Sequence, residues 1–257
     1  MPFTPSHVAA ILPLRGRAGV GLPLAALAAG SLSPDLPYFL PIPDWRVVSP
    51  LPHSLMGILT WDLLFGLVMW TAWRLGAGPL HDLAPDAIRR RWRPAGWPTT
   101  VGAAAMVVLA LLIGAGTHVL WDSFTHAGRF GTQRFPILNT LIETPLRTLP
   151  AYRWLQYLSG VVGLVAVAWV GLRQPMSWDP PRRRPGLARA AVWLIPLGAL
   201  VAVVQRFSVV GYTGLRDAAF AIATASIAGA VATTLLLCLL HAATTLTTQL
   251  ATSRPGR

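Results

Sequence analysis

Three side chains that can bind metal ions follow one another at helical spacing near the middle of the chain. His118, Asp122 and His126 stand at positions i, i+4 and i+8 of the segment that ends at His126. On a helix these positions share one face, with a modest angular drift. Imidazole nitrogens and a carboxylate suit Zn²⁺ or another divalent ion. The spacing therefore predicts a metal-binding face; the alternative is an interfacial polar cap in which His and Asp hydrogen-bond each other.

Three further polar residues precede this motif and are weaker candidates when each is considered alone. His7 follows Ser6, Asp35 follows Pro34, and His53 precedes a long apolar run. Alone, they are explained by a solvated first-turn histidine, a turn aspartate and a histidine at a helix start. They gain weight only if the fold brings them to the end of the helix that carries His118.

The elements that position these residues are predicted to be membrane helices. Hydrophobic residues make up 54% of the 257 residues and charged residues only 12%, about half of the ~25% that is usual in soluble domains. Five apolar runs approach the ~20 residues that a bilayer core requires: 54–74, 99–121, 155–172, 188–205 and 218–240. We predict an all-α integral membrane bundle with five long spans. Residues 1–175 would form the motif-bearing domain, and 176–257 two further transmembrane helices and a basic tail.

The first forty residues contain two apolar stretches, 7–14 and 20–32, that are too short to span a membrane. At 1.5 Å per residue, neither crosses a ~30 Å hydrocarbon core. The alternatives are one kinked span or a short half-depth helical hairpin with its turn at Arg15–Gly19. The hairpin returns the chain, so that His7 and Asp35 finish at the same end. The start of the sequence lacks the features of a signal peptide, and we expect insertion through the internal spans.

Arginine supplies all the basic charge, because the chain has 21 Lys and Arg residues and none is lysine. The clusters in 74–98 and 173–187 predict that these loops are cytoplasmic and that 122–153 lies on the other side. With the hairpin, this topology gathers His7, Asp35, His53 and the His118 motif at one membrane face. We expect a multi-pass protein of the cell inner or plasma membrane. A net charge of +12 could suggest nucleic acid, but no basic, aromatic-bearing soluble module accompanies it.

The remaining ionisable and small residues receive structural interpretations. His81 is expected in a solvated loop, His241 at an interface, and Asp62 paired with an arginine or a hydroxyl group within the bundle. Gly114 lies within a span and indicates close helix packing. The single cysteine, Cys238, excludes a disulfide framework and a cysteine zinc site.

The motifs around His7, Asp35, His53 and His118–His126 together resemble a bacterial family of multi-pass membrane proteins, domain of unknown function 4184, over about residues 1–175. More distantly, the order of these motifs is similar to membrane-bound metal-dependent hydrolases and to zinc-dependent phospholipase C, in which the motif residues bind zinc. The resemblance implies that one or two divalent ions, zinc above all, are bound by His7, Asp35, His53, His118, Asp122 and His126. The phospholipases also use an N-terminal amine and a later His-x-x-x-Glu, which this chain lacks, so a three-zinc site is not expected.

Such a site would support hydrolysis. A divalent ion lowers the pKa of water towards 7 and polarises a phosphoryl or acyl oxygen, and Asp122 or Asp35 could act as the base. Arg129 and Arg134 could bind a phosphate. We expect a membrane-embedded metal-dependent hydrolase whose partner is membrane lipid and whose substrate is lipid-like or a phosphoester.

Two non-hydrolytic functions remain as alternatives. The first is a non-catalytic membrane scaffold or accessory protein with a structural His/Asp cluster. The second, a metal or proton transporter, is disfavoured, because the later spans hold no acid within their apolar stretches and only Asp217 at an entrance.

Overall fold

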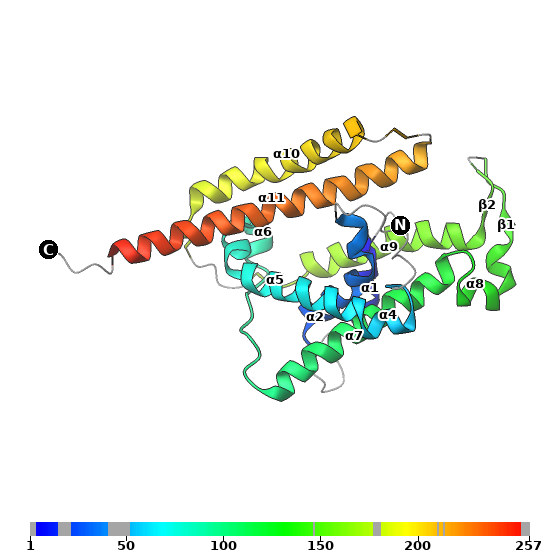
Figure 1. The fold of residues 1–257 in the computed structure, drawn as a ribbon, viewed down its shortest axis with the longest axis horizontal. Coiled ribbons are helices and arrows are strands. Elements are labelled where there is room, and N and C mark those ends of the chain that lie inside the picture. The colour runs from blue at the N-terminus through cyan, green and yellow to red at the C-terminus, as the bar shows by residue number, and fades with distance from the viewer. Residues whose placement is uncertain are drawn as a thin grey trace. The chain divides into compact units, whose positions relative to one another are not determined.

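A computed structural model of the chain describes residues 4–14, 22–40, 52–145, 147–176, 181–209, 211–212 and 214–252, with Arg216 and 248–252 described by their backbone alone. These residues are mainly helical, with almost no strand, which confirms the all-α prediction (Figure 1). Among them, five helices are long and apolar enough to cross a membrane: α5 (Trp61–Leu83), α7 (Val101–Thr125), α9 (Ala151–Leu172), α10 (Pro185–Val209) and α11 (Leu215–Thr252). The prediction of five long apolar helices is therefore confirmed.

The chain forms two compact units. The first comprises Phe3–Thr71 and Pro98–Gly171, and the second comprises Ala72–Trp97 and Leu172–Arg257. Residues 72–97 therefore group with the C-terminal helices, although they lie in sequence between the motif-bearing segments. All six candidate site residues belong to the first unit.

The N-terminal segment folds back on itself within the first unit. Its outgoing arm is made of η1 (Thr4–His7), α1 (Val8–Ile11) and η2 (Leu12–Leu14), and its returning arm of α2 (Leu24–Leu32) and η3 (Ser33–Phe39). The arms pack on each other, and the Thr4 hydroxyl donates a 2.6 Å hydrogen bond to Asp35 Oδ2. The start of the outgoing arm and the end of the returning arm thus lie together, as the hairpin hypothesis predicted for His7 and Asp35. Its expected turn at Arg15–Gly19 lies outside the described residues.

The returning arm crosses α7 at unusually close range. A Cβ atom added to Gly30 would lie 2.1 Å from the Leu111 carbonyl oxygen, and one added to Gly114 would lie 2.2 Å from the Leu27 carbonyl oxygen. Glycine at both positions permits this backbone contact, as expected for Gly114. Buried apolar residues surround the crossing and form the core of the unit: Ile11, Ala26, Leu27, Ala29, Trp70, Val107, Ala110 and Leu111.

The first span differs from its predicted bounds of 54–74. A short helix, α4 (Leu55–Leu59), ends at Thr60, whose φ of −121° and ψ of −90° are not helical, and α5 then continues to Leu83. The prediction placed a loop from residue 74 because charge appears at Arg74. The helix continues instead, since Arg74 lies over the Trp97 ring at 5.5 Å and Leu75–Leu83 stays largely apolar.

Short elements connect the long helices. They are α6 (Asp86–Arg89), α8 (Phe130–Arg134), η4 (Pro136–Asn139), β1 (Leu141–Ile142) and β2 (Leu149–Pro150). The two strands pair antiparallel, with Leu141 opposite Pro150. In the second unit, α10 and α11 pack side by side (Figure 1).

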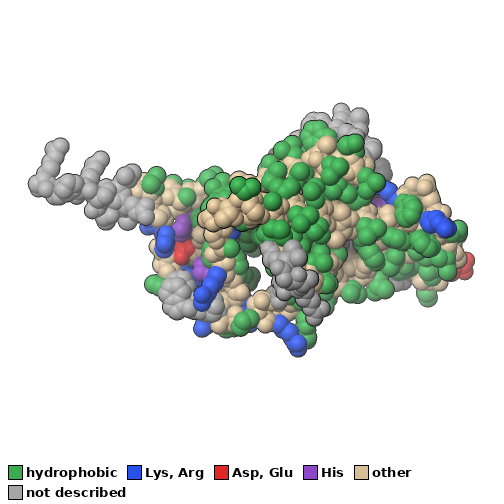
Figure 2. Space-filling model, turned by 90° about the horizontal axis from the view of Figure 1, so that it is seen from below, with side chains coloured by type: hydrophobic (Ala, Val, Ile, Leu, Met, Phe, Trp, Pro, Cys, Tyr) green, Lys and Arg blue, Asp and Glu red, His purple; other side chains and the backbone are tan. Residues whose placement is uncertain are grey.

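Hydrophobic side chains cover much of the exposed surface of the long helices (Figure 2). In α10 and α11, Trp193, Val204 and Leu239 expose 78%, 61% and 68% of their surface. An exposed apolar surface on this scale is expected for helices solvated by lipid rather than water. The fold is that of a multi-pass membrane protein.

Candidate metal centre

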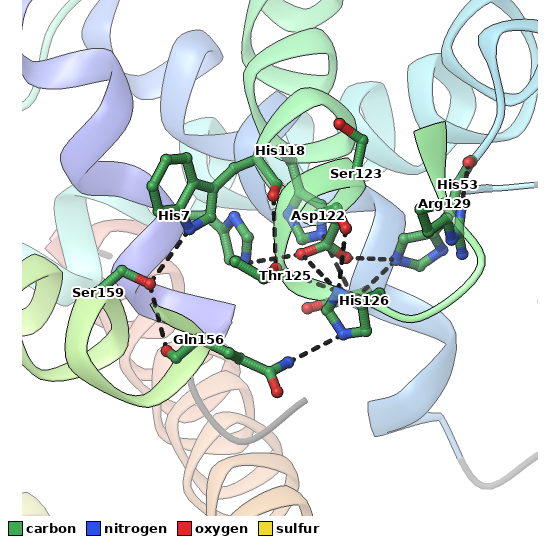
Figure 3. Close-up of polar contacts among 12 residues, drawn as sticks. His7, His53, His118, Asp122, Ser123, Thr125, His126, Arg129, Gln156 and Ser159 are labelled. Carbon is green, nitrogen blue, oxygen red and sulfur yellow. Dashed lines mark hydrogen bonds and ion pairs between the residues drawn. The ribbon is translucent and has the colours of Figure 1, made fainter. Parts of the chain in front are cut away.

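The six candidate residues come together at the C-terminal end of α7. His7 ends η1, Asp35 lies in η3, His53 stands before α4, and His118 and Asp122 lie on α7. The imidazoles of His7, His53 and His126 surround the Asp122 carboxylate (Figure 3). The structure thus gathers residues separated by more than a hundred positions into one polar cluster within an apolar unit.

Local turn chemistry fixes the two residues contributed by the connecting segments. Asp35 lies in a 3-10 helix that begins with Ser33-Pro34, and the Ser33 hydroxyl donates to the Gly30 carbonyl over 2.8 Å. His53 stands beside Ser54, whose side chain accepts a 2.9 Å hydrogen bond from Gly57 N and caps α4. Arg129 Nη1 also donates to the His53 carbonyl over 2.6 Å. These contacts hold the backbone at Asp35 and at His53 in place.

The end of α7 changes the expected role of His126. The helix stops at Thr125, and His126 has extended angles of −128° and 138°. Gly128 follows with a φ of +70°, a conformation that glycine adopts without strain where a helix ends. The spacing predicted that His118, Asp122 and His126 share one helical face. That prediction is wrong for His126, which lies beyond the end of the helix. His126 still lies near the cluster, with Nδ1 3.5 Å from Asp122 Oδ1.

The central distances are those expected between ligands of one ion. His118 Nε2 lies 3.6 Å from Asp35 Oδ1 and 3.5 Å from Asp122 Oδ2, and His7 Nε2 lies 3.6 Å from Asp122 Oδ1. These separations exceed the usual N–H···O range of about 2.7–3.2 Å. Ligands about 2.1 Å from a tetrahedral zinc ion are about 3.4 Å apart. His53 Nε2 lies 3.7 Å from Asp122 Oδ2 and 3.2 Å from Asp35 Oδ1.

His118 is oriented for ligation by its second nitrogen. Its side chain is fully buried, and Nδ1 contacts the Ser31 carbonyl at 2.7 Å. A carbonyl can only accept, so Nδ1 donates its proton to it, and the lone pair lies on Nε2 whenever the ring is neutral. Nε2 is buried without a hydrogen-bond partner among the described residues. Metal-binding histidines usually donate their other N–H in this way.

Two overlapping residue groups could hold an ion. One is His7, Asp35 and His118, and the other is His53, His118 and Asp122; the ligand atoms of each lie within 4.8 Å of one another. His118 Nδ1 is occupied by Ser31, so both groups depend on the same Nε2 atom. They therefore describe one shared centre.

His126 lies at the edge of this centre. Its side chain is 25% exposed, and the Gln156 amide donates to its Nε2 over 2.9 Å. Its Nδ1 lies 3.2 Å from the Asp122 carbonyl oxygen. Both ring nitrogens are engaged, which favours a role in holding Asp122 over direct ligation.

Electrostatics favour the metal-binding states of His7 and Asp35. Burial, together with the neighbouring His118, lowers the pKa of His7 to about 4, so His7 is neutral at physiological pH. Burial also lowers the pKa of His126. For Asp35, burial acts to raise the pKa of the carboxyl, but the positive charge of a protonated His118 and the hydrogen bond with His53 outweigh it, and the pKa falls. Neutral imidazoles and an ionised carboxylate are the forms that coordinate metals.

The sequence matches the family model described as Domain of unknown function (DUF4184) over residues 1–243. The chain belongs to the DUF4184 family. The match continues past residue 175, where the motif resemblance ended, and includes α10 and most of α11. No curated protein and no solved structure matches the chain.

Several residues that contact the candidate metal centre of this DUF4184 protein were not predicted from the sequence. Thr4, Ser31 and Gln156 hydrogen-bond Asp35, His118 and His126, and no spacing rule indicates contacts between such distant positions. Asp62 is fully buried, but neither carboxylate oxygen has a hydrogen-bond partner among the described residues. The expected pairing of Asp62 with an arginine or a hydroxyl group is therefore not found there.

Proposed function

We propose that this DUF4184 protein is a membrane-embedded metal-dependent hydrolase that binds one or two divalent ions, zinc above all, through its His/Asp cluster. The observation that carries the proposal is the geometry around His118 Nε2, which is buried, lacks a hydrogen-bond partner among the described residues and lies 3.5–3.6 Å from two carboxylates. The ligand set is His7, Asp35, His53, His118 and Asp122, with His126 at its edge.

The spacing favours an ion over a self-contained hydrogen-bonded lock. Asp35 and Asp122 are 0% and 2% exposed, and buried carboxylates are costly unless they are paired or coordinate a metal. A lock would draw nitrogen and oxygen to hydrogen-bond distance, as in the 3.2 Å contact between His53 and Asp35. The separations of 3.5–3.7 Å elsewhere leave room for an ion.

One of the two carboxylate ligands would also act as the proton acceptor. A divalent ion would supply Lewis acidity and a lowered pKa for water. Asp35 Oδ2 already accepts from Thr4, which commits that carboxylate to positioning. Asp122 faces the imidazoles of His7, His53 and His118 with both oxygens and is the better candidate for the general base.

The surroundings favour a substrate that arrives from the membrane. The cluster lies at the end of a candidate span, and the segment that follows exposes large apolar side chains: Phe130 at 66%, Ile137 at 74% and Leu141 at 65%. Such residues beside Arg134 are typical of a segment at the membrane–water interface. A lipid-like ester or phosphoester is thus the substrate class that the site would meet.

The deciding experiment compares His118→Ala with a histidine variant in the other unit. Wild-type protein should purify with zinc, measured by mass spectrometry of the metal, and should turn over a lipid phosphoester. His118→Ala should lose both metal and turnover while its helical circular dichroism is retained. His81→Ala removes an imidazole outside the cluster and should retain both.

Two results would contradict parts of the proposal. Full metal occupancy in His118→Ala would show that the cluster is not the metal site and would restore the hydrogen-bonded lock. Metal loss in His118→Ala, combined with no turnover of any lipid phosphoester by wild type, would leave a structural metal centre and favour the scaffold function.

A further inference from the structure

A cavity of about 540 Å³ opens in the second unit, and its lining residues all belong to that unit. It is lined by the C-terminal parts of α5 and α11, by Pro94 after α6, and by Pro181 and Arg183 before α10. Its apolar walls come from Leu75, Pro79, Pro94, Pro181, Ala242 and Leu246. The cavity shares no residue with the metal centre.

A buried Asp–His pair forms part of the cavity wall. His241 Nε2 lies 3.0 Å from Asp82 Oδ2, and the Asp82 carboxylate also accepts from the backbone N–H groups of Arg183 at 2.8 Å and Arg184 at 3.0 Å. His241 is only 3% exposed, and its Nδ1 has no hydrogen-bond partner among the described residues. A buried polar atom of this kind is costly unless something pairs with it. Because Nε2 donates to Asp82, Nδ1 of the neutral ring is an acceptor, and a hydroxyl group of a ligand in the cavity would supply its partner.

Arginine gives the cavity its positive charge. Arg89, 3% exposed, and Arg183 both line it. The Arg183 side chain is exposed and has no hydrogen-bond or ion-pair partner among the described residues. Arg182 is committed elsewhere, because its guanidinium donates to Asp86 and to the Ala84 carbonyl. The Asp82 carboxylate is hydrogen-bonded by two backbone amides and lies beside His241. Arg89 Nε lies 3.8 Å from Asp86 Oδ1, so Arg183 is the guanidinium that offers its positive charge to a ligand in the cavity.

We propose that this cavity binds the headgroup phosphate of an anionic phospholipid. Guanidinium groups recognise phosphate oxygens in a bidentate manner, and the apolar walls accommodate the glycerol and the start of the acyl chains. A free phosphate ion shares the anionic chemistry but would not need those walls. Basic pockets between transmembrane helices on the cytoplasmic side bind phospholipid headgroups.

The position of the cavity at the end of long helices supports a lipid occupant. Trp73 and Trp92 pack at 4.9 Å and Arg74 covers Trp97, a cluster typical of the membrane interface. Figure 2 shows arginine, histidine and acidic side chains gathered beside the C-terminal part of α11, next to hydrophobic surface. The phosphate of the headgroup would lie against the charged side chains, and the acyl chains against the neighbouring hydrophobic surface.

The test titrates the full chain in detergent with phosphatidylglycerol, phosphatidylcholine or inorganic phosphate and counts bound molecules by native mass spectrometry. Wild type should retain one phosphatidylglycerol in preference to phosphatidylcholine. Arg183→Gln should weaken that binding about tenfold or more, the effect of losing a charge-assisted contact. Arg183 is exposed, so this variant should fold. The matched control Arg189→Gln removes an exposed charge of α10 that does not line the cavity and should bind like wild type.

A second variant and the other ligands complete the test. His241→Gln should also weaken phosphatidylglycerol binding, with metal content unchanged. Equal losses in Arg183→Gln and Arg189→Gln would indicate diffuse surface charge and overturn the proposal, as would equal binding of both lipids. Inorganic phosphate that binds with the same dependence on Arg183 would identify a soluble phosphate site instead and would equally overturn the lipid.

Discussion

At the scale of single residues, the candidate centre depends on groups that hydrogen-bond its ligand residues and do not themselves bind an ion. The Ser31 carbonyl fixes the His118 tautomer, the Arg129 guanidinium holds the His53 backbone, and the Thr4 hydroxyl holds Asp35. None of these three groups is positioned to bind the ion. They limit the rotation of the ligands, so that the ligand atoms stay at the distances an ion requires.

Thr4 offers the cleanest test of this second layer. Its hydroxyl donates a 2.6 Å hydrogen bond to Asp35 Oδ2, and both residues are buried. Thr4→Val keeps the shape of the side chain but leaves that carboxylate oxygen unpaired. On the proposal that the cluster binds zinc, we expect zinc affinity to fall by about 10–100-fold, measured by competition with a chelator.

The control for Thr4→Val is Thr4→Ser, which restores the hydroxyl and should retain affinity close to wild type. Weakening of similar size in both variants would indicate that the methyl packing of Thr4, and not its hydrogen bond, matters to the centre.

At the scale of elements, the centre exists because a short helix and a long helix cross without side chains between them. At this crossing α2 reaches α7 through Gly30 and Gly114, and the contact carries Ser31 and Asp35 to the level of His118 and Asp122. Any side chain at the crossing would push the returning arm away from α7. The geometry of the ligands therefore depends on two residues that have no side chain.

Gly114→Ala should accordingly destabilise the protein, whereas Gly116→Ala should not. A Cβ atom introduced at position 114 would lie 2.2 Å from the Leu27 carbonyl oxygen, but nothing lies within 4 Å of the corresponding atom at position 116. We expect Gly114→Ala to lose about 1–3 kcal/mol or more through overpacking. Gly116→Ala should stay within about 1 kcal/mol of wild type, because alanine favours a helix over glycine. Unfolding in mixed detergent micelles measures both.

The two variants occupy the same helix half a turn apart, so solvent and lipid effects are matched. Similar unfolding midpoints for both would mean that α2 does not press on α7 at Gly114. In that case the position of Asp35 beside His118 would need another cause.

At the scale of the whole molecule, the sequence predicts the helices, which follow from apolar runs, and misses the side-chain contacts between positions far apart in the chain. Apolar runs give the long helices, and the returning hairpin places His7 with Asp35, since both follow from length and hydropathy. The contact between Asp82 and His241 spans 159 positions, and neither residue carries a pattern that points to the other. For the same reason His241 was expected at an interface, although the structure buries it.

Sidedness is also a property of the whole chain, and arginine distribution predicts it. The clusters at Arg89–Arg91 and Arg182–Arg184 lie on alternate connections between long helices, which predicts that both face the cytoplasm. The connection that follows α7 would then face outward, together with the candidate metal centre. A hydrolase with this orientation would act on the outer leaflet or on lipid-linked material beyond it.

Cysteine labelling tests that orientation directly. In a Cys238→Ala background, single cysteines at positions 90, 183 and 148 replace residues whose side chains are exposed, so all three should react in detergent. In intact cells, a membrane-impermeant maleimide should label Thr148→Cys and leave Arg90→Cys and Arg183→Cys unlabelled until the cells are broken. The detergent reaction is the control, because it separates a protected position from an unreactive one. Efficient labelling of position 90 or 183 from outside, with position 148 protected, would invert the topology and place the His/Asp cluster at the cytoplasmic face.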